Sequence, residues 1–139
     1  MHMKRTRLVA LTILVVLLDA HLIGQEDHSS GAPQVWGGRH VSMVMSSENT
    51  TFEFDCAQGV IMSAIQPGPD GQFTATGTYT PQRGGPVKKD SPPNDLPATY
   101  KGTIHGNSMT LEVLLEDKTQ QPPPLTLRKG ETGRITKCR

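Results

Sequence analysis

Two cysteines are the residues of this chain whose type and number most directly predict chemistry. Cys56 and Cys138 are the only thiols, and an even count favours one intramolecular disulfide in an oxidising compartment. The bridge would close a loop of 138 − 56 = 82 positions, for which chain entropy gives about 4 to 5 kcal/mol of stability. Two free thiols are the alternative. A zinc site is not expected, because the chain has no Cys-x-x-Cys pair and, beyond its N-terminal segment, only His28, His40 and His105.

Two acidic side chains have a spacing that general acid–base chemistry could use. Glu53 and Asp55 lie two positions apart and would share one face of a strand. A solvated strand face produces the same spacing, and this is the interpretation we adopt. The chain has no serine in a nucleophile-elbow pattern and no glycine-rich loop before a helix. We therefore predict a protein that is not an enzyme and that uses no cofactor and no metal.

The N-terminal residues have the three-part pattern of a secretory signal peptide. Basic residues precede an apolar run from Leu8 to Leu18, and small residues follow at Ala20 and Gly24. A membrane anchor is the alternative, but this run is much shorter than the roughly 20 residues that cross a bilayer. We expect a signal peptide at 1–24, a flexible segment at 25–34 and a single domain at 35–139. The mature protein would be periplasmic or extracellular, with no membrane span.

Composition limits the class of the mature domain. The 14 Lys and Arg residues nearly balance the 13 Asp and Glu residues, whereas a nucleic-acid-binding domain normally has a clear basic excess. The 14 glycines and 11 prolines favour many short elements joined by turns over a few long helices. We expect a monomeric protein with a single domain that does not bind nucleic acid.

Apolar and polar residues alternate along much of the chain, which predicts strands. The pattern is clearest from Phe52 to Cys56, from Gln72 to Tyr79 and from Met109 to Glu116. The full set of predicted strands is 35–45, 52–56, 60–66, 72–79, 100–104, 109–116, one around 125–127 and 135–138. Turn residues separate them, including the pairs Gln58–Gly59 and Gly106–Asn107.

Eight short strands in series predict an all-β fold, an antiparallel up-and-down meander closed or nearly closed into a small barrel. Cys56 and Cys138 would end the second and eighth strands, which run in the same direction, so both sulfur atoms would lie at one end of the barrel. A two-sheet β-sandwich is the alternative, because Greek-key order also brings distant strands together.

A series of residues along the whole mature domain resembles a group of small, uncharacterised, exported bacterial proteins. This series begins with Trp36-Gly37-Gly38, includes Cys56 in Glu-Phe-Asp-Cys-Ala and ends with Cys138. The resemblance implies an exported, disulfide-closed domain and no particular activity. More loosely, one early tryptophan followed by a strand meander is similar to the calycin fold of lipocalins and avidins.

Two classes of function fit such a barrel, and both are binding roles. In the first, a small apolar ligand lies inside and contacts inward-facing residues: Trp36, Met43, Tyr79, Tyr100 and Met109. In the second, the interior is filled and the proline-rich connection 81–97 contacts a protein partner through Gly84, Gly85 and Pro86. Small secreted barrel inhibitors of proteases work in this second way. We favour interaction with a protein.

Overall fold

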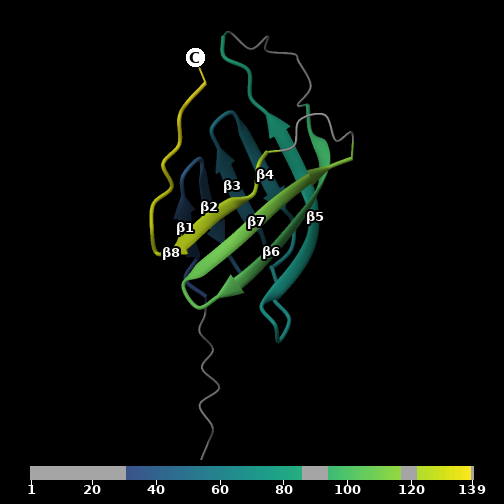
Figure 1. The fold of residues 1–139 in the computed structure, drawn as a ribbon. Helices are drawn as coiled ribbons and strands as arrows, with labels where there is room; N and C mark the ends of the chain where they lie inside the picture. Colours follow the sequence, from purple (N-terminus) through teal and green to yellow (C-terminus); the bar gives the residue numbers. More distant parts are fainter. Residues whose placement is uncertain (1–30, 86–93, 117–121, 139) are drawn as a thin grey trace, which may run out of the picture.

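The computed structural model describes residues 31–85, 94–116 and 122–138 (Figure 1). Within these residues the fold is all-β. The strands are β1 Gln34–Gly38, β2 Val41–Met45, β3 Thr50–Phe54, β4 Ala57–Ile61, β5 Gln72–Pro81, β6 Leu96–His105, β7 Ser108–Leu115 and β8 Leu125–Lys129. In this part of the chain no helix is long and apolar enough to cross a membrane. The predicted signal peptide and all but the last few residues of the segment 25–34 lie outside the described ranges, and β1 begins at Gln34.

The strands form one closed antiparallel barrel in up-and-down order. Each strand pairs with the next along the chain, and β1 closes the sheet against β8, with Trp36 opposite Lys129. Alternate side chains point inward, so Phe52 and Phe54 of β3 are buried while Glu53 between them is partly exposed. The predicted meander closed into a small barrel is confirmed, and the two-sheet sandwich is not what this chain forms.

The predicted number of strands, eight, is correct, although two of the predicted strands are wrong. Residues 35–45 are not one strand but the hairpin of β1 and β2, which turns at Arg39 and His40. His40 has a φ of 69°, in the left-handed region where histidine is enriched among non-glycine residues. The predicted strand 135–138 was also wrong, because residues 130–138 form only an isolated parallel bridge, between Arg39 and Arg134.

The second hairpin also lies differently from its prediction. Its turn is at Asp55 and Cys56, and β4 covers residues 57–61 instead of 60–66. Gly59, which was interpreted as a turn residue, lies inside β4. This strand position is a glycine because Tyr100 occupies the space that a side chain would need. A Cβ atom at Gly59 would lie 2.2 Å from the hydroxyl oxygen of Tyr100. This glycine is a packing residue.

Aromatic side chains form the centre of the core. Tyr100 stacks on Phe52, with ring centroids 4.6 Å apart, and Phe52 stacks on Phe54 at 5.8 Å. Gly102 makes room for Phe73 in the same way, since a Cβ atom there would lie 2.5 Å from the Phe73 ring. Inward glycines therefore allow large rings to fill a barrel built from short strands.

After β8 the chain returns along the outside of the barrel as a C-terminal strap, residues 131–138 (Figure 1). The strap brings Cys138 to the β3–β4 turn, where its sulfur is bonded to that of Cys56 and the Cα atoms are 5.4 Å apart. The predicted cysteine pairing is confirmed. Cys138 reaches this end of the barrel by way of the strap and not at the end of an eighth strand.

Candidate functional site

The structure gathers the predicted ligand-contacting residues in one packed core. Trp36 is 2% exposed, and Met43, Tyr100 and Met109 are fully buried, while Tyr79 is partly buried against Phe54. None of these five residues lines the hollow beside the edge of β5, the hollows over β2–β4 and over β5–β7, or the one beside the C-terminal strap. Their arrangement is that of side chains filling a small barrel.

Tyr100 has the most strongly perturbed ionisation among the described residues. Its hydroxyl donates a hydrogen bond to the backbone oxygen of Thr78 at 2.6 Å. Burial raises the pKa of the Tyr100 phenol far above its ordinary value, and the nearby phenol of Tyr79 raises it further. Tyr100 is therefore a neutral hydrogen-bond donor that fixes two strands of the core, which is a structural role.

The predicted loop contact is described only in part. Gly84 and Gly85 are exposed at the disulfide end of the barrel, whereas Pro86 lies outside the described residues. The start of this connection is held by a hydrogen bond from Gln82 N to the Cys56 carbonyl oxygen at 2.7 Å. The loop thus begins directly beside the cysteine bridge.

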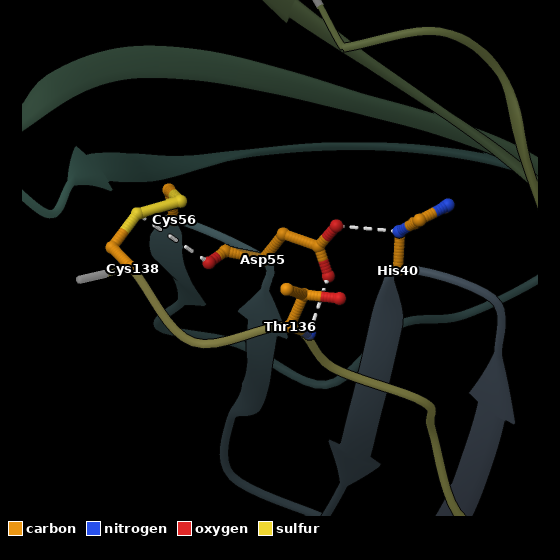
Figure 2. A network of polar contacts seen from close by, with 5 residues as sticks. All are labelled: His40, Asp55, Cys56, Thr136 and Cys138. Carbon is orange, nitrogen blue, oxygen red and sulfur yellow. Dashed lines mark hydrogen bonds and ion pairs between the residues drawn. A yellow bond between two sulfur atoms is a disulfide. The ribbon is translucent and has the colours of Figure 1, made fainter.

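The acidic pair is used to hold the C-terminal strap. Asp55 accepts a hydrogen bond from Thr136 N at 2.8 Å, and its other carboxylate oxygen lies 2.5 Å from His40 Nδ1 (Figure 2). Glu53 forms an exposed ion pair with Lys137. Sequence spacing offered no carboxylate for His40, because Asp55 approaches it only through the pairing of β2 with β3. The two carboxylates have partners that account for them without catalysis.

A different feature stands out on the sheet, where the seam between β4 and β5 is only half closed. β4 pairs with β5 from Ala57 opposite Pro81 to Val60 opposite Thr78. Beyond that point β5 continues back to Gln72 and pairs with β6 alone. Within the described part of the chain, the first half of β5, residues 72–77, therefore has one edge without a neighbouring strand.

Hydrogen bonds beyond both ends of β5 show which of its residues face each neighbour. Ile104 N donates to Gly71 O at 2.9 Å, so the odd-numbered residues of β5 exchange hydrogen bonds with β6. At the other end Gln82 N donates to Cys56 O, so the even-numbered residues face β4. The two observations agree, because the strand register is constant along β5.

Two threonines expose unpaired backbone groups at this free edge. Gln72 also faces it, but its oxygen accepts from Gly68 N and its nitrogen donates to Asp70 Oδ1. Thr74 and Thr76 lie farther along the same edge, and no described residue provides a hydrogen bond to their N–H or C=O groups. The edge thus presents two donors and two acceptors in strand geometry.

These groups face a surface groove of about 400 Å³. One wall is the edge of β5 at residues 73–76, and the other is the segment 63–66 after β4. Phe73 and Ile65, both nearly buried, line it among the polar residues. The sequence prediction missed this groove because it extended a strand through 60–66. The polar Ser63 within that apolar run was the one signal that the strand ends early.

No family model, no curated protein and no solved structure matches this chain. The resemblances to small exported bacterial proteins and to calycins remain predictions.

Proposed function

We propose that this protein is an exported, non-enzymatic interaction module, monomeric when free, that binds an extended segment of a partner protein. The segment adds as a strand to the free edge of β5. The observation that carries this proposal is the pair of residues Thr74 and Thr76, whose backbone donors and acceptors have no partner among the described residues. A strand edge with unpaired groups is a template for another strand.

The chemistry of the groove defines the segment that fits. Backbone hydrogen bonds to Thr74 and Thr76 supply affinity that is largely independent of sequence. Side chains of an added strand point alternately toward the barrel and away from it, so specificity would come from the residues beside Phe73 and Ile65. At about 3.4 Å per residue, the free edge from 72 to 77 matches a segment of about four to six residues.

A small apolar ligand inside the barrel has less support. The residues that would line its site are Trp36, Met43, Tyr79, Tyr100 and Met109. Four of them are at most 2% exposed and pack against one another and their neighbours. A ligand would have to displace packed side chains, which a preformed site does not require.

The proposal is tested by selecting extended peptides from a random library on the folded protein and comparing two proline variants. Thr74→Pro removes an N–H that faces the groove, which a strand edge tolerates. Ala75→Pro removes an N–H that bonds β6, and we expect it to destabilise the barrel, because a proline inside a sheet removes a ladder hydrogen bond. Selected peptides should protect the Thr74 and Thr76 amides from hydrogen exchange and should not bind Thr74→Pro.

Peptides that bind the wild-type protein and Thr74→Pro equally well would overturn this site. Native mass spectrometry of the protein purified from its own host tests the competing function. A retained small molecule that survives in Thr74→Pro would favour the apolar ligand instead.

A further inference from the structure

The C-terminal strap passes the seam between β1 and β8 (Figure 1). A second hollow lies there, on the outer face of the barrel. Its volume is about 240 Å³. Six polar side chains line it: Arg39, Arg128, Arg134, Thr126, Thr132 and Glu131. Three separate elements thus contribute one arginine each: the β1–β2 turn, β8 and the strap.

Backbone pairing brings these arginines together. Arg39 and Arg134 are partners in a parallel bridge, fixed by hydrogen bonds from His40 N to Arg134 O and from Arg134 N to Gly38 O, each 2.9 Å long. Partner residues in a ladder point to the same side of the sheet. The side chains of Arg39 and Arg134 therefore extend from adjacent positions on one face.

Arg128 lies on the same face of the sheet, opposite a glycine of β1. It pairs with Gly37 across the β1–β8 seam, and Gly37 lies two positions before Arg39 on β1, so both arginines share one side. Gly37 must lack a side chain, because a Cβ atom there would lie 2.4 Å from Glu131 O and Gly133 N of the strap. The strap can pass close to the sheet only because this position has no side chain.

The charges in the hollow are not balanced. Three arginines and Glu131 leave a net charge of +2, and none of the arginines forms an ion pair within the described residues. Like charges on adjacent strand positions repel. Guanidinium groups bind planar or tetrahedral oxyanions through paired hydrogen bonds, and the hydroxyls of Thr126 and Thr132 add further donors.

We propose that this hollow binds a doubly charged tetrahedral oxyanion, a phosphate or sulfate group. The net charge of +2 matches such a dianion better than it matches a single carboxylate. The group is either a free ion or an ester on a larger molecule, and both would use the same arginines. This site is independent of the peptide groove beside β5, with which it shares no residue.

The test is a calorimetric titration of the oxidised full-length mature protein with inorganic phosphate, glycerol phosphate, sulfate and acetate, at low ionic strength and about pH 8, where a phosphate monoester is dianionic. We expect saturable binding of the dianions and much weaker binding of acetate. Saturation by inorganic phosphate supports a site for the free ion, and tighter binding of glycerol phosphate supports one for an ester.

Three matched variants separate a site from general surface charge. Arg134→Gln and Arg128→Gln should each weaken phosphate binding about tenfold, the effect of losing one charged hydrogen-bonding group. Lys129→Gln removes the neighbouring charge, which lies opposite Trp36 and does not line the hollow, and should leave the affinity within about twofold. No saturable dianion binding, or equal losses in Lys129→Gln and Arg134→Gln, would overturn the proposal. Thr74→Pro should bind phosphate normally.

Discussion

Replacing both cysteines by serine is expected to lower the free energy of unfolding by about 4 to 5 kcal/mol. The Cys56–Cys138 bridge joins positions separated by 82 residues, so in the unfolded state it restricts the part of the chain that contains β4 to β8 and the strap. The chain-entropy relation gives about 4.5 kcal/mol for a loop of this length at 25 °C. A domain of about 100 residues has roughly 5 to 15 kcal/mol of stability in total. The bridge therefore accounts for at least about a third of it.

The assay is reversible urea unfolding of the oxidised wild-type protein and of the Cys56→Ser, Cys138→Ser double variant, followed by Trp36 fluorescence and by circular dichroism. In thermal unfolding of the same two proteins, the midpoint of the double variant should be lower by about 16 °C or more, at 4 to 8 °C for each kcal/mol. Lys137→Gln is the matched control, because it breaks only the exposed strap contact to Glu53 and should cost at most about 0.5 kcal/mol.

A loss below about 1 kcal/mol in the double variant would contradict this role of the bridge, since it would mean that the long loop does not limit the unfolded ensemble. A comparable loss of stability in Lys137→Gln would also contradict this role of the bridge. The stability would then come from local strap contacts and not from the covalent closure.

Three further changes test the interior. Thr50 is fully buried and its hydroxyl has no hydrogen-bond partner among the residues that the structure describes, so Thr50→Val should raise the free energy of unfolding by about 1 kcal/mol in urea titrations; a loss would reveal a partner for the hydroxyl. Gly59→Ala should cost about 1 to 3 kcal/mol by displacing Tyr100, and Tyr100→Phe in the same chain should recover part of that loss by removing the clashing oxygen. Because the pKa of Tyr100 is raised in the folded state, its contribution to stability is complete below the ordinary pKa of 10.0 and is lost as pH rises above it. Thermal unfolding of Tyr100→Phe should depend less steeply on pH above 10 than that of the wild-type protein, and equal slopes would contradict this assignment.

Side-chain alternation predicted the architecture because a small barrel has one wet and one dry face on every strand. The segments around Phe52, Phe73 and Met109 show this period, with Leu114 as an exception in the third, and all three are strands. Strand ends were less predictable. The two turn residues, Arg39 and His40, are not glycine, proline or asparagine, and the glycine pair just before them lies in β1 and not in the turn.

The groove beside β5 could not be predicted from the same pattern. It exists because β4 ends at Ile61 and leaves Thr74 and Thr76 without partners. Whether a strand edge is paired depends on the length of its neighbour, which alternation does not determine. The arginine hollow is still less visible in the sequence, since Arg39 and Arg134 are far apart along the chain and meet only through the strap.

The C-terminal strap explains why a barrel that is closed by its own strands also has a covalent tie. β1 and β8 share only three residue pairs, among them two glycines that add no side-chain contacts of their own: Gly37 and Gly38. The strap covers this seam with backbone hydrogen bonds to the β1–β2 turn. Its residues are mostly exposed and polar, so apolar burial alone would hold it weakly. The disulfide at its far end supplies the missing constraint. The β1–β8 pairing and the backbone hydrogen bonds of the strap thus hold the seam and the arginine hollow, and the disulfide fixes the far end of the strap.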